Sequence, residues 1–489
     1  MNYKIMAKIQ AWILLIEAAL MVPPLIISMC MRENKNVFAF LLTIAVTASI
    51  SLILGLVSKD AKAKFYAKEG LVCVGLAWIV LCLLGALPFF FSGTIPHYVD
   101  AFFETVSGFT TTGSSILNEV EHLGKGMLWW RSFTHWVGGM GVLVFFLAII
   151  PVSGSGGFSL HILRAESTGP AVGKSTPRMR ETASALYLIY IGLTVLDFIF
   201  LLIGKMKVFD AACIAFGTAG TGGFTVLNTG FATYTPFAIN VTTVFMLLFG
   251  VNFSVYFMIL FKHVWKAIKN EELMYYGIIV VCSTLFFSLN IYQKTAQTMN
   301  IGDTVMHSAF QVGALITTTG YATADFAKWP AFSQAVALVL MMIGACAGST
   351  GGGMKIARVM LLFKSLKRNV HKLTKPNEIR VVRLNKQKVS EQTVANVNAY
   401  LAAYVIIIVV SFLIVSLDKA NYTVTSNLSA VISTFNNIGP ALDQIGPMSN
   451  YSGYSVLSKL VFSFDMLFGR LEIFPILILL LPSTFKKNQ

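Results

Sequence analysis

The sequence has few charged residues for its length. Lys, Arg, Asp and Glu make up 12% of its 489 residues, whereas soluble globular proteins carry about 25%. This shortage of charge argues against a soluble enzyme. Hydrophobic residues make up 56% of the chain, which excludes intrinsic disorder, because disordered chains lack the apolar side chains that drive burial.

The sequence also lacks any CxxC spacing. Its six cysteines lie in or beside apolar stretches, so we interpret them as small buried hydrophobic residues and predict neither a disulfide framework nor a metal site. These cysteines are Cys30, Cys73, Cys82, Cys213, Cys282 and Cys346. A signal peptide is not indicated, because the first apolar stretch is long, is broken by Pro23 and Pro24, and precedes no small-residue cleavage site.

Long apolar runs are what the sequence does have. A transmembrane helix needs about 20 mostly apolar residues. Such stretches lie near 8–30, 37–57, 70–92, 127–151, 182–204, 235–262, 273–293, 331–365, 395–417 and 456–482. We therefore predict an all-α polytopic membrane protein with ten spans and with both termini on the cytosolic side.

The distribution of basic residues agrees with this topology. The net charge is +15, and the predicted cytosolic segments hold 26 Lys and Arg residues against 10 in the predicted outer segments. Cytosolic loops of membrane proteins carry this excess, so the basic charge is explained without a nucleic-acid partner. The densest basic run, 355–388, could also dock an acidic partner or anionic membrane lipid.

Four semi-apolar stretches in the predicted outer connections are too short to span a membrane. Each begins near an Asp, Ser or Asn, residue types that favour a helix N-cap, and each precedes a polar string with glycine. The stretches are Asp100–Phe109, Asp210–Gly217, Asp303–Ile316 and Ser426–Phe435. The strings consist of Thr110, Thr111, Thr112 and Gly113; Ala219, Gly220, Thr221 and Gly222; Thr317, Thr318, Thr319 and Gly320; and Asn436, Asn437, Ile438 and Gly439.

The strings recur at a regular spacing. Their last glycines are 109, 98 and 119 residues apart, which predicts an internal repeat of span, short re-entrant helix, string and span. The predicted units are two N-terminal transmembrane helices at 1–69 and four pore repeats at 70–151, 182–262, 273–368 and 393–482.

Strings of this composition suit a cation. Non-helical backbone at membrane depth is tolerated only inside protein or along a water-filled path. A short helix entering from outside points its negative C-terminal end toward the membrane centre, and carbonyl and Thr hydroxyl oxygens can replace a cation's hydration shell. No Cys, His or carboxylate cluster accompanies them, so an alkali ion is favoured. The alternative is four ordinary outer loops, which the four-fold recurrence disfavours.

Seven motifs carry a family resemblance. They are Ser107–Ser115 (SGFTTTGSS), His135–Phe145 (HWVGGMGVLVF), Thr218–Phe224 (TAGTGGF), Thr317–Phe326 (TTTGYATADF), Gly348–Lys355 (GSTGGGMK), Phe435–Leu442 (FNNIGPAL) and Gly469–Pro475 (GRLEIFP). With these motifs the chain resembles the TrkH/TrkG and KtrB group of potassium-transport subunits, within the superfamily that includes fungal Trk and plant HKT proteins. The two extra N-terminal spans resemble the TrkH branch.

The resemblance implies potassium uptake across the bacterial inner membrane through a pseudo-fourfold selectivity filter in one chain. It further implies a homodimer and a cytosolic TrkA-like ring that binds ATP, ADP or NAD; nucleotides would act only through that partner. The second string has Ala219 and Gly222 where a bulkier residue and Ser are expected, and each repeat keeps essentially one filter glycine. A sodium-permeable variant and a sodium- or proton-coupled symporter therefore stay open.

A glycine-rich segment interrupts the predicted span at 331–365. Glycine destabilises a helix by about 1 kcal/mol relative to Ala, so Ala345–Gly353 is not expected to be helical. A phosphate-binding P-loop is excluded, because the Gly-Lys-Ser/Thr sequence and a preceding strand are absent. A packed kink and a flexible intramembrane gating loop remain, and the resemblance implies the gate. Its residues would include Ala345, Gly348, Ser349, Thr350, Gly351, Gly352 and Gly353.

Arg470 lies within the last apolar run. A charge at membrane depth is costly and indicates a functional site by default. A salt bridge to Asp465 or Glu472 is the structural alternative, whereas the resemblance implies a barrier below the filter that could alternate with the loop. His135, Glu104 and Glu17 are expected to be structural, although Glu104 could add negative potential at the mouth. A serine hydrolase using Ser155 is a remote alternative, because no His is placed to reach it.

Overall fold

The structure is a computed structural model, which describes residues 1–59, 67–141, 179–260, 263–295, 300–378 and 380–485. It is a bundle of helices with one short antiparallel hairpin, β1 (Arg383–Leu384) and β2 (Gln387–Lys388). The α-helices are α1 (Tyr3–Leu20), α2 (Val22–Cys30), α3 (Asn34–Val57), α4 (Ala67–Gly85), α5 (Leu87–Phe91), α6 (Tyr98–Phe109), α7 (Lys125–Gly139), α10 (Met179–Ile203), α11 (Val208–Gly220), α12 (Pro236–Phe249), α13 (Phe253–Leu260), α14 (Val264–Ile268), α15 (Glu271–Thr295), α16 (Ile301–Ile316), α17 (Ala331–Ile343), α18 (Ile356–Thr374), α19 (Glu391–Val415), α20 (Val424–Phe435), α21 (Val456–Arg470) and α22 (Phe474–Leu480). Three 3₁₀ turns complete these elements: η1 (Phe326–Lys328), η2 (Asp443–Ile445) and η3 (Pro482–Thr484).

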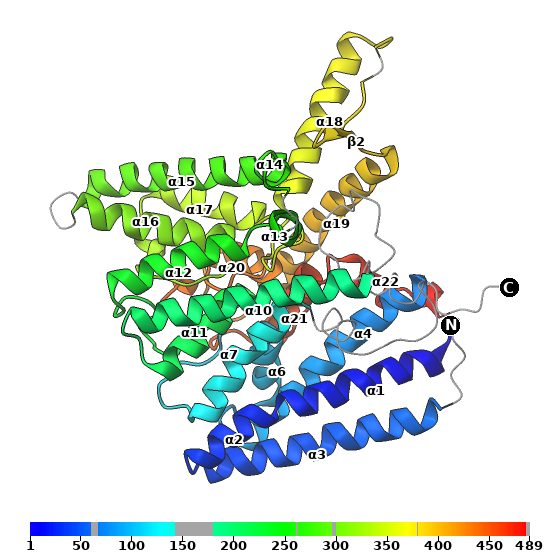
Figure 1. Ribbon diagram of the computed structural model, residues 1–489, viewed down its shortest axis with the longest axis vertical. Helices are drawn as coiled ribbons and strands as arrows, with labels where there is room; N and C mark the ends of the chain where they lie inside the picture. The colour runs from blue at the N-terminus through cyan, green and yellow to red at the C-terminus, as the bar shows by residue number, and fades with distance from the viewer. Residues whose placement is uncertain (60–66, 142–178, 261–262, 296–299, 379, 486–489) are drawn as a thin grey trace.

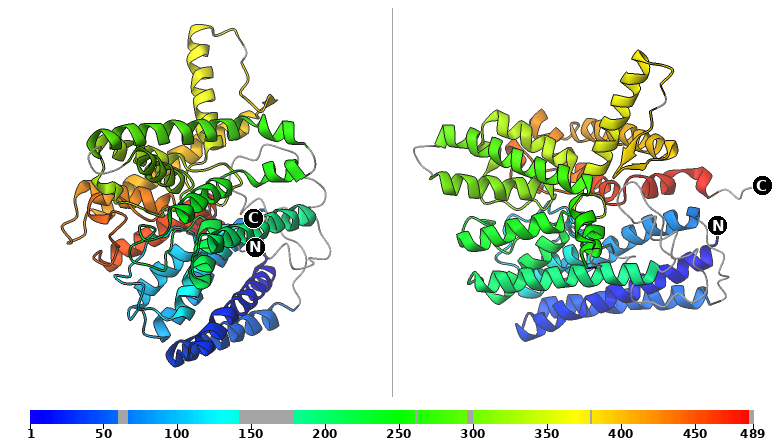
Figure 2. Two further views of the ribbon diagram at one scale, coloured as in Figure 1. Left: turned by 60° about the vertical axis from the view of Figure 1, so that its left-hand side comes forward. Right: turned by 45° about the horizontal axis from the view of Figure 1, so that its top comes forward.

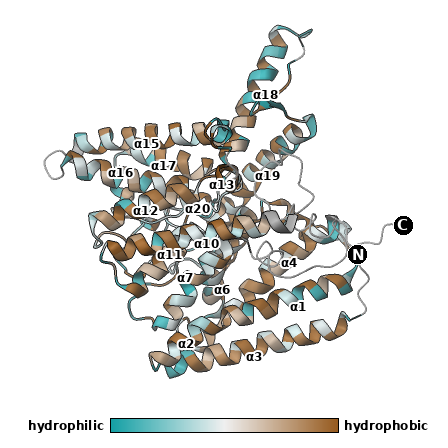
Figure 3. Cartoon of the chain, in the orientation of Figure 1, coloured by the Kyte–Doolittle hydropathy of each residue, from teal (hydrophilic) through white to brown (hydrophobic). Residues whose placement is uncertain are grey.

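Within the described ranges, six helical segments are long and apolar enough to cross a membrane, and a seventh is a bent pair. The six are Tyr3–Cys30, Asn34–Val57, Lys68–Phe91, Ala183–Ile203, Glu271–Gln293 and Glu391–Val415. Their apolar side chains face outward as well as inward: Leu52 is 65% exposed and Leu188 is 74% exposed. Figure 3 shows the hydrophobic colour along these helices. Because water would penalise such faces, lipid is their natural surrounding.

The other expected spans are interrupted helices. The stretch 235–262 consists of α12 and α13, which meet at 88°. The stretch 331–365 divides into α17 and α18, and the stretch 456–482 divides into α21 and α22. In the stretch 127–151, helix α7 ends at Gly139, and residues 142–151 lie outside the described ranges. The count of ten spans therefore stays a prediction, because a hydropathy average passes over such breaks.

The four predicted short helices are present as α6, α11, α16 and α20. Each packs against at least two helices near it in sequence and against one from another part of the chain: α21 for α6, α7 for α11, α12 for α16 and α17 for α20. Thr423 alone of the four N-cap residues caps its helix through its side chain. Asp100, Asp210 and Asp303 lie in the first helical turn instead, where a carboxylate stabilises the helix dipole.

Two features lie at the edges of the bundle. Helix α18 projects away from the other helices, as Figures 1 and 2 show. The start of α1 and the last helix, α22, lie toward the same end of the bundle in these views.

All six cysteines are free, and Cys30 and Cys282 are exposed, so the prediction of burial was wrong for these two. Both belong to apolar helices, whose outward faces accept a small hydrophobic thiol.

Candidate functional site

Four residues at the ends of the short helices have left-handed backbone conformations. They are Thr111 (φ 56°), Thr221 (φ 54°), Thr318 (φ 59°) and Asn437 (φ 56°). A β-branched residue at positive φ is a genuine outlier, and each such residue costs about 1–3 kcal/mol. Strain of this kind, stored at the three threonines, persists only where the surrounding structure holds it and is typical of functional sites. Asn437 adopts the same conformation at lower cost.

A glycine follows two residues after each of these positions, and all four glycines have positive φ. They are Gly113 (φ 82°), Gly223 (φ 84°), Gly320 (φ 77°) and Gly439 (φ 102°). A Cβ atom on Gly113 would overlap the carbonyl oxygen of Gly222, and the same relation joins Gly223 to Thr319, Gly320 to Ile438 and Gly439 to Thr112. Each string thus lies against the next, and the fourth lies against the first. The four strings form a closed ring.

The register of the second string differs by one residue from the prediction. Its left-handed residue is Thr221 and its equivalent glycine is Gly223 rather than Gly222. The string therefore runs over Gly220–Gly223, and Ala219 belongs to helix α11. Two adjacent glycines made the two registers indistinguishable by sequence, and backbone dihedral angles separate them. In the other three strings the glycine of the ring is the last residue, Gly113, Gly320 or Gly439.

Oxygen atoms dominate the ring. The hydroxyl groups of Thr110 and Thr112 are 2.8 Å apart, and those of Thr317 and Thr319 are 2.7 Å apart. Two further buried oxygens, Oγ1 of Thr111 and Oδ1 of Asn437, have no hydrogen-bond partner among the described residues. No group of three or more His, Cys, Asp or Glu side chains suited to a metal occurs within the described ranges. Neutral oxygens of this kind suit an alkali cation.

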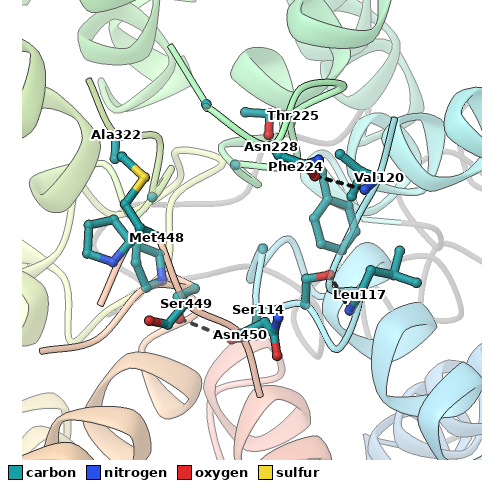
Figure 4. A pocket seen from close by; sticks show the side chains of 18 of the residues that line it. Ser114, Leu117, Val120, Phe224, Thr225, Asn228, Ala322, Met448, Ser449 and Asn450 are labelled. Atoms are coloured by element: carbon teal, nitrogen blue, oxygen red, sulfur yellow. Dashed lines mark hydrogen bonds between the residues drawn. The ribbon is translucent and has the colours of Figure 1, made fainter. Parts of the chain in front are cut away.

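A pocket of about 210 Å³ opens beside the ring. All four ring glycines line it, together with residues that follow each string (Figure 4). Figure 4 shows Phe224 and Asn228 across the pocket from Met448 and Ser449. Asn228 accepts a hydrogen bond from the N–H of Val120 at 2.9 Å. The pocket therefore joins segments that are far apart in the sequence.

His135 has the expected structural role. Its Nδ1 atom lies 2.8 Å from the carbonyl oxygen of Gly108, and its Nε2 atom accepts the N–H of Phe224 at 3.3 Å. The first bond requires a proton on Nδ1 and the second requires a lone pair on Nε2. A neutral imidazole therefore joins the end of α6, before the first string, to the residue that follows the second string. A Cβ atom on Gly222 would overlap the imidazole of His135.

Glu104 is paired with Arg131 rather than free to supply negative potential. The Nε atom of Arg131 lies 2.6 Å from Oε1 of Glu104, and both side chains are buried. Arg131 was not among the site residues predicted from the sequence. An arginine inside the apolar stretch 127–151 is the signal that could have found it, as it did for Arg470. Glu17 is also buried, and neither carboxylate oxygen has a hydrogen bond among the described residues.

The predicted glycine-rich loop joins α17 to α18 and lies directly against the ring. The N–H of Gly352 donates to Oγ1 of Thr318 at 2.6 Å, and the N–H of Gly353 donates to the carbonyl of Asn436 at 3.1 Å. A Cβ atom on Gly351 would lie 2.7 Å from the carbonyl oxygen of Thr317. Glycine at these positions therefore permits the loop to contact the start of the third and fourth strings.

Side chains hold the loop in this place. Oε1 of Glu272 accepts the N–H of Ala347 at 2.6 Å. The ammonium group of Lys355, which follows the loop, bonds the carbonyl of Gly351. Both side chains are buried. Neither residue was predictable from the sequence, because their partners are backbone atoms that no sequence pattern specifies.

Arg470 ends helix α21 and contacts three carbonyl groups. Its Nη1 atom lies 2.8 Å from the oxygen of Thr350 in the loop, and Nη2 bonds the oxygens of Gly138 and Gly139. The candidate partners from the sequence have other contacts: Asp465 accepts the Ser411 hydroxyl at 2.7 Å, and Glu472 pairs with Arg358. Arg470 thus connects the loop to the end of α7.

This arrangement defines a membrane transport protein. The sequence profile of the TrkH family, described as a cation transport protein, matches residues 36–487, and the chain belongs to this family. Members of the family are transporters rather than enzymes, which removes the hydrolase alternative; Ser155 itself lies outside the described residues.

Curated relatives and a solved structure agree with this assignment. The chain is 33% identical to the Trk system potassium uptake protein TrkH of Salmonella typhimurium, with all of both chains covered. It is 28% identical to the Trk system potassium uptake protein TrkG of Escherichia coli, with 94% of each chain covered. The crystal structure of the potassium transporter TrkH from Vibrio parahaemolyticus matches with a TM-score of 0.88 at 30% identity, covering 99% of this chain and 100% of that one.

Proposed function

We propose that the closed ring of strings is the selectivity filter of a potassium-uptake pore. The single observation that carries this proposal is the contact of each ring glycine with the carbonyl group of the next string. Such a ring places backbone and Thr oxygens around one axis, where they can replace the hydration shell of an ion. The relatives are named for potassium uptake, which supports potassium as the cargo.

The proposed pore has four repeats within ten spans, in the bacterial inner membrane. The pocket beside the ring glycines is then its outer mouth, and the loop Ala345–Gly353 lies on the cytosolic side of the filter. The excess of basic residues in the predicted cytosolic segments supports this orientation. So do the start of α1 and helix α22, which lie toward one end of the bundle.

The loop is proposed as the gate and Arg470 as a positive barrier beneath the filter. The contacts of the loop with Thr318 and Asn436 support a position that blocks an ion leaving the ring. The contact of Arg470 with Thr350 supports a joint action of the two. By resemblance, a homodimer and a TrkA-like cytosolic ring that binds nucleotides belong to the same proposal.

Rubidium flux into liposomes that hold the purified chain tests this function. Flux without a pH or sodium gradient, with potassium the strongest competitor and sodium and lithium weaker, is the expected result. The membrane potential supplies about 2.3 kcal/mol per charge per 100 mV, so a channel-like pore needs no second ion. Absence of flux both alone and with a nucleotide-binding partner ring would contradict the proposal.

A coupled symporter is the second candidate, and one observation favours it. Asp465 is buried in α21, and its Oδ2 atom has no hydrogen bond among the described residues. A protonatable carboxylate at membrane depth is what proton coupling requires. Flux that depends on an imposed pH gradient in the native chain, and loses that dependence in Asp465→Asn, would favour the symporter over the pore.

A further inference from the structure

The buried pair of Glu104 and Arg131 lies at one quarter of the ring. Glu104 belongs to α6, before the first string, and Arg131 belongs to α7, after it. Only 1% of Glu104 and 4% of Arg131 are exposed. Their contact, at 2.6 Å between Nε and Oε1, is a charge-assisted hydrogen bond. Charges this deeply buried need further partners, because an unsatisfied buried charge is costly.

The further partners of Glu104 follow the first string. Its Oε2 atom accepts the N–H of Ile116 at 3.0 Å, and its Oε1 atom accepts the hydroxyl of Ser115 at 3.0 Å. These residues come two and three positions after Gly113. The carboxylate therefore fixes the backbone where the first string leaves the ring.

The further partners of Arg131 follow the second string. Its Nη1 atom donates to the carbonyl of Thr225 at 3.1 Å, and its guanidinium lies 3.5 Å from the centre of the Phe224 ring. These residues come directly after Gly223. Arg131 also lines the pocket that opens beside the ring glycines. One ion pair thus joins the outer ends of two neighbouring strings.

This pair occurs at a single position of the ring. Glu104 precedes its ring glycine by nine residues, and the residues nine before Gly223, Gly320 and Gly439 are Ile214, Gln311 and Ala430. None of these three side chains carries a charge. The charge balance of the mouth therefore depends on Glu104 and Arg131 at this one place.

We infer that the Glu104–Arg131 pair is a specificity-determining element of the filter, which holds the first and second strings at a fixed spacing and keeps the mouth neutral on that side. The inference rests on the proposed pore. Removal of one partner leaves an unpaired charge beside the path of a cation, in surroundings where water screens it poorly. The two single changes therefore act on cations with opposite sign, whereas a purely structural pair would give two losses of the same kind.

The test measures rubidium flux in liposomes for Glu104→Gln, Arg131→Gln and the double variant. With Glu104→Gln, the positive charge of Arg131 repels cations, and the KM for potassium rises about tenfold. With Arg131→Gln, the carboxylate attracts cations, and the KM falls while sodium competes better. The double variant returns the KM to within about threefold of the native value, because the charge balance is restored. Lys328→Gln is the matched control, since Lys328 pairs with Asp325 and its side chain is 84% exposed.

Two results would overturn the inference. One is a shift of KM in the same direction for both single variants, and the other is a loss of maximal rate alone with unchanged KM and unchanged potassium-to-sodium preference. Should the neutral variants fail to fold, Arg131→Lys and Glu104→Asp decide instead. Both variants keep the charges but lose the geometry of the ion pair. Sodium is therefore expected to compete better, while the KM for potassium stays within about twofold of the native value. Unchanged competition by sodium would contradict the inference.

The same assay separates this inference from the proposed pore. The native chain and a ring variant, Gly113→Ser, are measured in parallel. Absence of potassium-competed flux in the native chain, both alone and with the partner ring, would refute the pore itself. Normal native flux, with a selectivity change in Gly113→Ser and none in the Glu104 and Arg131 variants, would refute only the role of the pair.

Discussion

Arg470 donates a hydrogen bond to the carbonyl oxygen of Thr350, and the two atoms are 2.8 Å apart. A charged side chain at the end of α21 thereby holds the middle of the loop that contacts the ring. The same guanidinium bonds two carbonyl groups at the end of α7. These three hydrogen bonds clamp the loop to the end of α7, and the proposed barrier adds an electrostatic role for the same group.

The first prediction concerns this charge. Arg470→Gln keeps a hydrogen-bonding side chain and removes the charge, so basal rubidium flux is expected to rise about tenfold. Arg470→Lys keeps the charge and loses the planar fork, and flux close to the native value is expected. Equal flux in the native chain and in Arg470→Gln would show that the charge is no barrier.

The second prediction concerns the loop. Deletion of Ser349–Gly351 removes the segment that reaches Arg470 and Lys355. A gate shortened in this way cannot cover the ring, so basal flux is expected to rise several-fold in the liposome assay. A loss of flux, with native behaviour in size-exclusion chromatography, would assign the loop a role in forming the filter instead.

The third prediction concerns the ring glycines. Gly113→Ser or Gly320→Ser places a Cβ atom on a carbonyl oxygen of the next string, which distorts the ring and weakens the preference for potassium over sodium. Gly93→Ser is the control, because Gly93 also has a positive φ (73°) but nothing lies within 4 Å of its Cβ position. Unchanged ion competition in both ring variants would refute the assignment of these glycines.

The fourth prediction concerns an ion pair between α18 and the turn after Arg470. Arg358 contacts Glu472, and its guanidinium lies 4.1 Å from the centre of the Tyr400 ring. Glu472→Gln removes this ion pair, which links α18, the helix that follows the loop, to the turn after α21. We therefore expect raised basal flux and a free energy of unfolding lower by about 2–3 kcal/mol. Exchange of the two charges should restore part of both.

A second pair on α18 provides the control for this experiment. Arg368 contacts Glu391, whose side chain is 66% exposed. Arg368→Gln should change stability by less than about 1 kcal/mol and leave basal flux unchanged. An equal effect of Arg368→Gln and Glu472→Gln would show that α18 responds to any lost charge rather than to this link.

The fifth prediction concerns pH. Burial raises the pKa of Asp418, but hydrogen bonds from the Ser458 hydroxyl and from the N–H groups of Ser455 and Ala420 outweigh it and lower the pKa to about 2. The stabilisation is therefore complete above the ordinary Asp pKa of about 3.9 and is lost as pH falls toward about 2. At pH 7, Asp418→Asn should lower the free energy of unfolding by about 1 kcal/mol and lower the melting temperature accordingly. Near pH 2 the same substitution should have little effect. An equal effect at both pH values would contradict this assignment.

The parts of the site that depend on local sequence were predictable. The four short helices begin and end within about two residues of the predicted ends except for α11, because each is an apolar segment bounded by polar or glycine residues. Helix α11 continues to Gly220, since nothing in the run of Ala and Gly after Gly217 forces it to stop. The same ambiguity shifted the second string by one residue.

Features that depend on distant contacts were not predictable. Arg131 and Glu104 are 27 residues apart, and Lys355 bonds a backbone carbonyl. Neither relation has a periodicity that a sequence reveals. The break at Leu471–Ile473 also escapes a hydropathy average, which records composition and not direction, whereas its glycines made the break at Ala345–Gly353 predictable. Ile473 has a φ of 69°, a strained value that its neighbours in the folded chain must hold.

The closure of the ring also constrains how the protein is made. The side-chain amide of Asn437 donates to Oγ1 of Thr112 at 3.0 Å, across 325 residues of chain. During synthesis the first string therefore lacks its final neighbour until the ribosome has made nearly the whole protein. A nascent chain that stops short of Gly439 has an open ring whose strained threonines lack support. If the ring is the proposed filter, a chain without its last string has no complete filter.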